Sequence, residues 1–199
     1  MEISGKQVKY IFNKKIFSIV NNSDKNRYHV WPGGNNLLCK GLASIIASLP
    51  DCFNNQEHAD IVFIDISVQN FHAIIMEEWI QAFNDCKLIL ICDNKLSPLA
   101  HHWLLRMRTL GVTGGIIYPY DSIDEIIRKI TIIISGQTII ADNITPKISL
   151  KEYSILQLLY LGANAKKIAS FCNSTVKTVY AHKSSIERKI SIPINRIPR

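Results

Sequence analysis

The sequence lacks any long apolar run. No stretch approaches the roughly 18 consecutive apolar residues that a membrane span requires. The first residues, which include Glu2 and Lys6, do not form the hydrophobic region of a secretory signal. We therefore expect neither a membrane protein nor an exported protein, but a protein of the cytoplasm without a membrane partner.

Paired cysteines are also lacking. The five cysteines are scattered and none belongs to a C-x-x-C pair: Cys39, Cys52, Cys86, Cys92 and Cys172. This pattern suggests neither a disulfide framework nor a zinc site. The sequence also lacks a G-x-G-x-x-G loop directly after a strand-like run, and no pairing of catalytic groups is evident. We therefore expect no metal, no cofactor and no enzyme activity.

Three further features have simple structural interpretations. His101-His102-Trp103 could suggest a metal site, but successive residues of a helix do not share a face. A structural role is also expected for His182. WPGGNN, Trp31–Asn36, is interpreted as a turn rather than as a phosphate cradle.

Negative charge is scarce in the last quarter of the chain. Residues 147–199 contain ten Lys and Arg but only two acids, Glu152 and Glu187, a net charge of +8. The whole chain carries +7, which leaves −1 for residues 1–146. A near-neutral body joined to a small basic unit indicates a polyanionic partner, and nucleic acid is the first candidate.

Short apolar runs alternate with helical patterns in the body. Continuous Ile-rich and Val-rich runs predict buried strands at Ile16–Val20, Ile61–Asp65, Leu88–Cys92 and Gly115–Tyr118. Apolar residues at helical spacing predict helices over Asn35–Leu49, Asn70–Asn84, Ser97–Gly111 and Ser122–Gly136. Ser97 is the predicted N-cap of the third helix, and Ser122 opens a capping-box pattern with Glu125 in the fourth. This alternation predicts an α/β fold with a doubly wound parallel sheet. Residues 1–34 stay open: they contain three strands, or one sheet strand and a long loop.

The basic unit predicts a small all-α domain of three helices. The first has Ile155, Leu158 and Leu159 turned inward, with Leu161 as a further candidate. The second holds Ile168 and Ala169 inside, and the third begins at Ser174 or Thr175 and runs to about Ile190. Two helices joined by a tight turn, the second of them long and basic, describe a helix-turn-helix.

The third helix has two different faces. Its core-facing residues recur at helical spacing: Val179, His182 or Lys183, Ile186 and Ile190. The opposite face is of a width to enter a major groove and has Lys183 and Lys189 at its flanks. It carries Lys177, Tyr180, Ala181, Ser184 and Arg188.

Residues Ile148–Ile190 resemble the DNA-binding domain of LuxR/FixJ-type transcriptional regulators. The residues that carry the resemblance are Glu152, Leu156, Gly162, Lys166, Ile168, Ala169, Thr175, Thr178, Val179, His182, Ile186 and Lys189. The resemblance implies binding to double-stranded promoter DNA, with groove-facing positions at Tyr180, Ala181 and Ser184. It places Lys177, Thr178, Lys183 and Lys189 near phosphates, and Lys166, Thr175 and Arg188 complete the expected DNA-binding set.

Two departures from this family lie near the end of the chain. Cys172 and Ser174 stand where larger aliphatic residues are usual. Family members add a fourth helix that helps the domain dimerise, but SIPINRIPR contains Pro193 and Pro198 and should form little helix.

The body is similar to the receiver domain that many of these regulators carry. This likeness puts Asp65 at the phosphoacceptor position, at the carboxyl end of a strand. A receiver needs two acids after its first strand and a lysine after its fifth, and here Asn21, Asn22 and Tyr118 stand at those places. Where a receiver has a Ser or Thr after its fourth strand, this chain has Cys92 or Asp93. Phosphoryl transfer needs the metal and the cation to neutralise charge, so we expect Asp65 to be a degenerate phosphoacceptor.

These resemblances predict the organisation of the whole chain. Residues 1–136 form a degenerate receiver-like domain, residues 137–147 a linker, and residues 148–199 the helix-turn-helix domain. Over nearly the whole length the chain also looks like enterobacterial regulators of common-pilus (Mat fimbria) operons, through fragments such as NNSDK, FID, LAHHW, GGIIY and VKTVYAH.

We therefore expect a transcriptional regulator of fimbrial or other surface-structure genes that acts without phosphorylation. It should form a homodimer through a receiver-type surface composed of Ser97–Leu110, Gly115–Tyr118 and Ser122–Ser135. Two alternatives stay open: a phosphorylation-switched response regulator, and a regulator that acts mainly as a heterodimer partner. A nucleotide-dependent enzyme would need a phosphate loop and catalytic pairs that are not evident.

Overall fold

A computed structural model describes residues 28–49, 60–139 and 147–198. The predicted strand Ile16–Val20, together with Asn21, Asn22 and Cys52, lies outside these ranges. No helix of the described ranges is long and apolar enough to span a bilayer.

Four parallel strands form the central sheet in the order β1-β2-β3-β4. Val30 pairs with Phe63, and Phe63 with Ile89, so the middle of the sheet is apolar across three strands. Three of the predicted strands are confirmed, and the open stretch before residue 34 supplies the fourth. The bounds are β1 Tyr28–Trp31, β2 Ile61–Ile66, β3 Lys87–Cys92 and β4 Gly114–Ile117.

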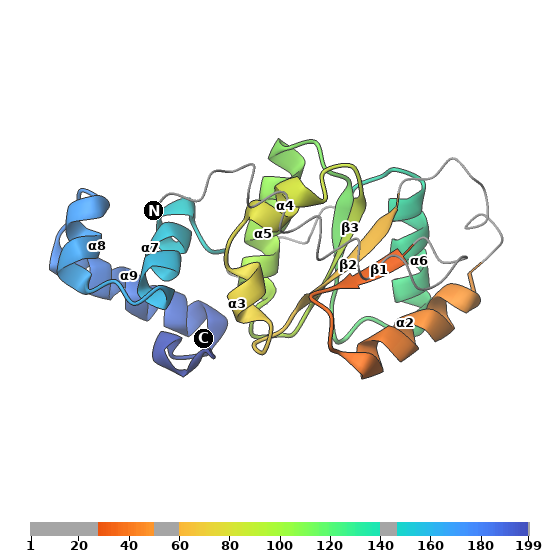
Figure 1. Ribbon diagram of the computed structural model, residues 1–199, viewed down its shortest axis with the longest axis horizontal. Helices are drawn as coiled ribbons and strands as arrows, with labels where there is room; N and C mark the ends of the chain where they lie inside the picture. The colour runs from red at the N-terminus through yellow and green to blue at the C-terminus, as the bar shows by residue number, and fades with distance from the viewer. Residues whose placement is uncertain (1–27, 50–59, 140–146, 199) are drawn as a thin grey trace.

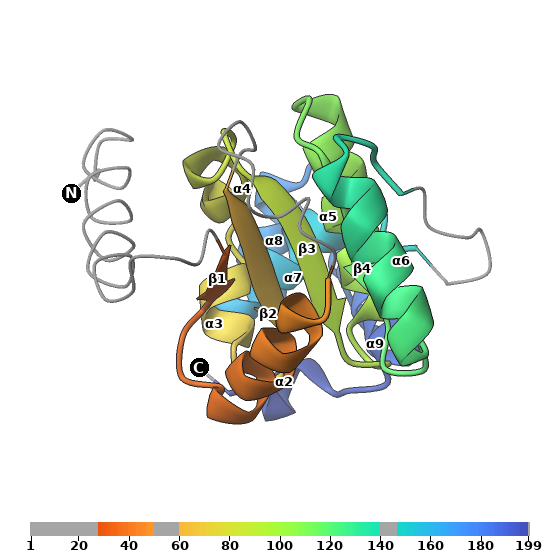
Figure 2. The ribbon, with the colours of Figure 1, turned by 90° about the vertical axis from the view of Figure 1, so that its right-hand side faces the viewer.

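Helices cover both faces of the sheet, which confirms the doubly wound α/β fold (Figure 2). Alternate residues of β2 point to opposite faces: Ile61 and Phe63 pack with α2 and α6, whereas Val62 and Ile64 pack with the helices of the other face. One face has α2 (Asn36–Ala47) and α6 (Ile123–Ile134), and the other has α3 (Phe71–Ile74), α4 (Glu78–Ala82) and α5 (Ser97–Thr109).

The single helix predicted over Asn70–Asn84 is wrong, because the structure breaks it into α3 and α4. The break is stabilised by side chains that donate hydrogen bonds to backbone carbonyl oxygens. In a continuous helix these oxygens would accept from backbone N–H groups instead. The indole Nε1 of Trp79 donates to the oxygen of Ile74 (3.0 Å), and the Tyr153 hydroxyl donates to that of Ile75 (2.5 Å). A helical pattern does not reveal the second of these donors, because Tyr153 lies far from Ile75 in the sequence.

Two capping predictions have different outcomes. Ser122 caps α6 as predicted, since its hydroxyl accepts from the backbone N–H of Glu125 (3.2 Å). The N-cap of α5 is Leu96 rather than Ser97, because the carbonyl oxygen of Leu96 accepts the first helical hydrogen bond, from the N–H of Ala100 (3.0 Å). The N–H of Leu96 in turn donates to the carboxylate of Asp93 (2.8 Å).

Three helices and a short 3-10 turn form the C-terminal unit: α7 Leu150–Tyr160, α8 Ala165–Phe171, α9 Val176–Ile190 and η2 Ile194–Arg196. Ile155 is buried as predicted, but Leu158 and Leu159 are only half-buried and Leu161 is 64% exposed. Tyr153, Leu156 and Tyr160 fill the inner face of α7 instead.

The end of the chain folds back onto α7. Ile194 and Ile197 are buried, and the hydroxyl of Tyr160 donates to the carbonyl oxygen of Pro198 (2.8 Å). The prediction that these residues form little helix is confirmed, since the 3-10 turn η2 has only three residues.

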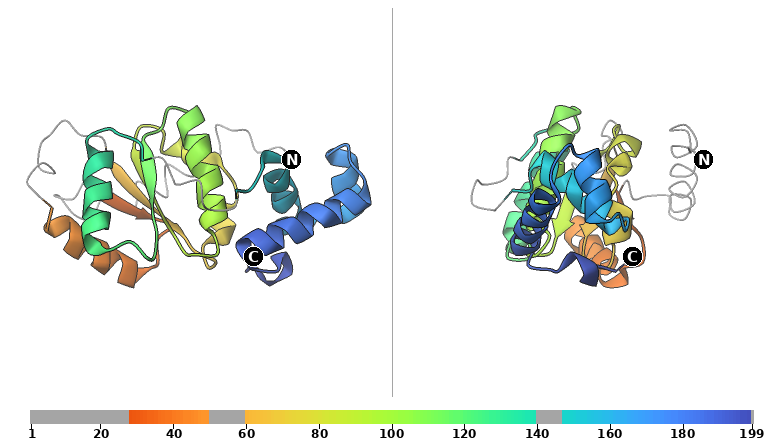
Figure 3. Two further views of the ribbon diagram at one scale, coloured as in Figure 1. Left: turned by 180° about the vertical axis from the view of Figure 1, so that it is seen from behind. Right: turned by 90° about the vertical axis from the view of Figure 1, so that its left-hand side faces the viewer.

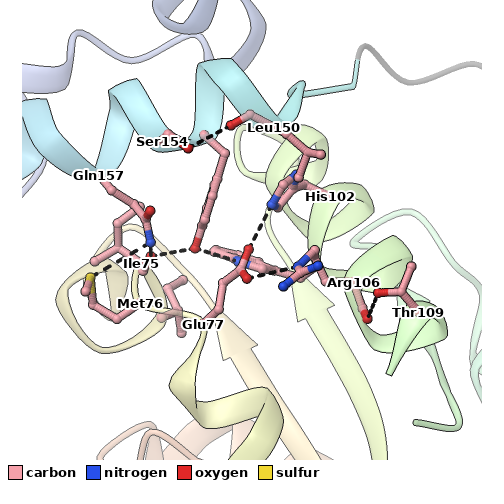
Figure 4. A network of polar contacts seen from close by, with 12 residues as sticks. Ile75, Met76, Glu77, His102, Arg106, Thr109, Leu150, Ser154 and Gln157 are labelled. Carbon is pink, nitrogen blue, oxygen red and sulfur yellow. Dashed lines mark hydrogen bonds and ion pairs between the residues drawn. The ribbon is translucent and has the colours of Figure 1, made fainter. Parts of the chain in front are cut away.

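The C-terminal unit packs directly on the body, through α7 against α3 and α5 and through α9 against α5 (Figures 1 and 4). The Tyr153 hydroxyl accepts from the indole Nε1 of Trp103 (3.1 Å) while it donates to Ile75, and the amide of Gln157 donates to the same Ile75 oxygen (3.0 Å). Burial raises the pKa of Tyr153. Residues of both units therefore belong to one continuous apolar cluster.

An ion-pair network on α4 and α5 orients one side of this contact (Figure 4). Glu77 accepts from His102 Nε2 and from Arg106 Nε, each at 3.0 Å. Burial opposes ionisation of Glu77, but these hydrogen bonds outweigh it and lower its pKa. The His102 ring stacks on Tyr153 at 4.2 Å between centroids. The structural interpretation of His102 is confirmed.

Candidate nucleic-acid interface

The turn between α8 and α9 is set by local capping. Asn164 caps α8 through the N–H of Lys167 (2.9 Å), and Thr175 caps α9 through the N–H of Thr178 (3.1 Å). Between the helices Asn173 has a φ of 46°, a left-handed conformation that asparagine tolerates better than most residues. The N–H of the next residue, Ser174, donates back to the Ala169 oxygen (2.8 Å) and closes the turn. Of the two predicted N-caps of α9, Thr175 is the one observed.

The inner face of α9 agrees with its predicted pattern. Val179, Ile186 and Ile190 are buried, while His182 and Lys183 are both half-buried. Ile168 and Ala169 of α8 are buried as well. The two helices of the motif therefore share one small core with α7.

The outer face of α9 is not covered by any other residue that the structure describes. Seen from behind, α9 runs from its contact with the body outward to α8 (Figure 3). One stripe of side chains along this face is exposed: Lys177, Tyr180, Ala181, Ser184 and Arg188. Tyr180 in this stripe is 57% exposed.

The buried carboxylate of Glu152 links α7 to α9 through hydrogen bonds. Glu152 accepts from the Ser149 N–H (2.8 Å), from the Ser185 hydroxyl (2.8 Å) and from the Lys189 ammonium (2.7 and 2.8 Å). Burial opposes its ionisation, but hydrogen bonds, first that from Lys189, lower its pKa to about 2.

Lys189 has its ammonium occupied by this carboxylate and by the carbonyl oxygen of Lys147 (2.8 Å). It was predicted to lie near a phosphate, but its three donors all have acceptors within the domain. In this structure Lys189 joins helices rather than facing outward. The sequence resemblance identified Lys189 as a residue typical of the family, but it did not distinguish a structural role from a role in binding phosphate.

The second acid of the C-terminal unit also pairs internally. Glu187 lies 3.8 Å from the Lys183 ammonium and accepts from the N–H of Ile194 (2.9 Å). Both acids are thus used within the domain, while Lys166 of α8 and the cations of the outer α9 face are exposed. The surface around α9 is therefore dominated by uncompensated positive charge.

Asp65 lies at the carboxyl edge of the sheet, as predicted, and is 5% exposed. Asn35, the N-cap of α2, donates its amide to Asp65 Oδ2 (3.0 Å). Asn21 and Asn22 lie outside the described residues; the described strand beside β2 is β1, which leads into Asn35. The stretch WPGGNN therefore forms a turn in which Asn35 caps α2 and also hydrogen-bonds to Asp65.

Tyr118 directly follows β4, as predicted, and its hydroxyl hydrogen-bonds to His101 Nε2 (2.7 Å). Sequence reasoning missed Lys129 of α6, which is buried and whose ammonium lies 2.6 Å from Asp121 Oδ2. The same ammonium lies 4.9 Å from the centre of the Tyr118 ring. A lysine on the apolar face of a predicted helix was the signal that could have pointed to it.

No three His, Cys, Asp or Glu side chains of the described ranges gather closely enough to hold a metal ion. His101 and His102 have the separate partners described above, which agrees with their structural interpretation.

The family model described as "EcpR N-terminal domain" matches residues 8–134, well over half of the chain. The chain belongs to the EcpR N-terminal domain family. A second model, described as "Bacterial regulatory proteins, luxR family", matches residues 146–194 and so covers α7, α8 and α9. This member of the EcpR family is a LuxR-family DNA-binding transcriptional regulator, not an enzyme.

Solved structures with a similar fold include RcsB from Salmonella enterica serovar Typhimurium bound to the rprA promoter. The identity is 14%, the match covers 85% of this chain and 93% of that one, and the TM-score is 0.44. Full-length FixJ from B. japonicum is 11% identical, with 88% of this chain and 96% of that chain covered and a TM-score of 0.30. At such identities the likeness concerns the fold alone.

Proposed function

We propose that this regulator acts in the cytoplasm on promoters of fimbrial or other surface-structure genes, and that it acts without phosphorylation of Asp65. The observation that carries the DNA-binding surface is the exposed polar and basic stripe on the outer face of α9. Membership of the EcpR family and the sequence resemblance to regulators of common-pilus operons support the fimbrial targets.

Within the stripe, Tyr180, Ala181 and Ser184 lie where side chains reach base edges when a helix enters the major groove. Lys177 and Arg188 lie on the same face and supply charge for phosphates, as do the neighbouring residues Lys166 and Lys183, while the hydroxyls of Thr175 and Thr178 supply hydrogen-bond donors. Lys189 is left out of this set because Glu152 holds its ammonium.

Independence from phosphorylation is supported by what surrounds Asp65. A phosphoryl group needs nearby cations to balance the charge on its oxygens. Here the neighbour at the carboxylate is the neutral amide of Asn35, and Tyr118 stands where a receiver has lysine. The buried cation of this edge, Lys129, is paired with Asp121.

A homodimer would place two α9 helices on two half-sites and so raise the affinity without any new contact. The proposed interface uses the outer sides of α5, β4 and α6. Leu105 at 45%, Tyr120 at 69% and Ile123 at 65% exposure support it, because these apolar side chains lie along that edge. The inner side of α5 is covered by the C-terminal unit.

Genomic footprinting of the purified full chain, with and without acetyl phosphate, tests the proposal. We expect footprints at surface-structure promoters, no mass gain at Asp65, and equal promoter activity for wild type and Asp65→Ala at matched expression. A stable mass gain at Asp65 with lost activity of Asp65→Ala would establish the phosphorylation-switched alternative. A footprint that forms only when a second regulator is added would establish the heterodimer.

A further inference from the structure

A cavity of about 460 Å³ opens at the carboxyl edge of the sheet, between the strand ends, α2 and the start of α6. Its volume falls within the range of sites that bind small molecules. The walls are predominantly apolar and include Leu38, Leu42, Ile45, Ile91, Ile117 and Ile126. Asp65, Asp93 and Asp121 supply its charged groups.

Among the residues that the structure describes, one carboxylate oxygen of Asp65 has no hydrogen-bond partner and faces this cavity. Oδ2 accepts from Asn35, and no other described residue donates to the side chain of Asp65. No fully enclosed side-chain oxygen of the described residues lacks a hydrogen bond, so Oδ1 must be open to the cavity. A carboxylate that is 95% buried and has only a neutral amide as partner is costly to desolvate.

The described residues that line the cavity carry negative charge. Asp121 is balanced by Lys129, whose ammonium lies 2.6 Å from it, while Asp65 and Asp93 have no cation among their hydrogen-bond partners in the described residues. The pKa of the Cys92 thiol, which lines the cavity, is consistent with this charge. Burial is the largest cause that raises this pKa to about 12, and Asp93 and Asp121 raise it further, although Lys129 lowers it. Anions such as phosphate or a carboxylate would be repelled here.

We propose that this cavity binds a small organic amine, whose ammonium pairs with Asp65 Oδ1 and whose apolar body lies against α2 and Ile126. The ammonium supplies the charge and the donor that the buried carboxylate lacks. The aliphatic walls supply the burial that favours an apolar body over a bare cation. The position that a receiver uses for phosphorylation then serves here to bind a cationic ligand.

Calorimetric titration of the full chain with n-hexylammonium chloride, 1-hexanol, sodium hexanoate and magnesium chloride tests the proposal. We expect saturable binding of hexylammonium, at least tenfold weaker binding of hexanol, and no binding of hexanoate. Asp65→Asn should weaken hexylammonium binding at least tenfold. The control Asp124→Asn removes the same charge from an exposed position of α6 outside the cavity and should leave the affinity unchanged.

A second pair of variants tests the location of the site. Gly41 lines the cavity from α2, and a Cβ added there would meet nothing within 4 Å. Gly41→Phe should therefore fill the cavity and abolish binding, whereas Gly41→Ala should retain it. Equal binding of hexanol and hexylammonium, unchanged affinity in Asp65→Asn or Gly41→Phe, or a response to magnesium chloride alone would each overturn the proposal.

Discussion

Replacing Glu152 by glutamine removes one charge from the contact between α7 and α9 while it keeps the size of the side chain. The wild-type carboxylate is 6% exposed and holds the Lys189 ammonium at 2.7 Å. The one amide oxygen of glutamine can still accept from the Ser149 N–H, and its NH2 group can donate to the Ser185 hydroxyl, but Lys189 is left without its buried counter-charge. We expect a less stable helix-turn-helix domain in Glu152→Gln.

The size of the effect follows from the pKa of Glu152, which is about 2 in the folded protein against the ordinary value of 4.5. Each pKa unit corresponds to about 1.4 kcal/mol, so the charged form contributes about 3 kcal/mol at pH 7. Because the folded pKa is the lower one, this contribution is complete above pH 4.5 and is lost as the pH falls towards 2.

Urea unfolding of both proteins at pH 7, 4 and 3 measures this contribution. Glu152→Gln should be about 3 kcal/mol less stable than wild type at pH 7, and the gap should narrow to about half by pH 3. Its matched control is Glu125→Gln on α6. Glu125 occupies the same position after a capping serine, but its side chain turns to the exposed Arg128 (2.6 Å), so that change should have no measurable effect.

A gap that stays constant between pH 7 and pH 3 would refute the reasoning, because the charge of Glu152 would then not be its source. An equally large loss of stability in Glu125→Gln would refute it too, because a glutamate at the third position of any helix would then have the same effect without a buried partner.

Further predictions concern packing and base recognition. Tyr153→Phe should lower the free energy of unfolding by about 1–3 kcal/mol, because the Trp103 indole loses its acceptor; an unchanged urea midpoint would contradict this. Gly114→Ala should lower the melting temperature, because a Cβ there would collide with the carbonyl oxygen of Leu88. Gly41→Ala should raise the melting temperature, because Gly41 lies within helix α2 and a Cβ there would meet no other atom. Melting temperatures that both rise or both fall would contradict this. Tyr180→Ala and Ser184→Ala should each change the preferred base at one operator position by about 1–3 kcal/mol in a selection assay; equal losses on specific and random DNA would argue against groove contacts.

The sequence predicted those elements whose signal is local. The strands at Ile61, Leu88 and Gly115 are continuous apolar runs, and the caps Ser122 and Thr175 act within one helical turn, so spacing alone identifies them. The outer face of α9 follows in the same way from helical periodicity.

The errors arose where distant residues decide the structure. The break between α3 and α4 is stabilised partly by Tyr153 of α7, nearly eighty residues away in the sequence. Asn35 reaches Asp65 only because β1 lies beside β2. Lys189 resembles a phosphate contact until Glu152 is seen to hold its ammonium. Pairings of this kind depend on the tertiary fold, which periodicity and capping patterns do not encode.

The central claim, that the outer face of α9 binds DNA, is tested most directly by the salt dependence of operator binding. Fluorescence anisotropy of the full chain should give a linear fall of log K with log salt. Lys177→Ala combined with Arg188→Ala should make this slope shallower by about 1.8, since each lost phosphate contact removes about 0.9. Lys40→Ala combined with Lys95→Ala removes two exposed cations of the receiver-like domain outside the proposed dimer surface and should leave the slope unchanged. An unchanged slope in the α9 pair, or an equal change in the control pair, would contradict the claim.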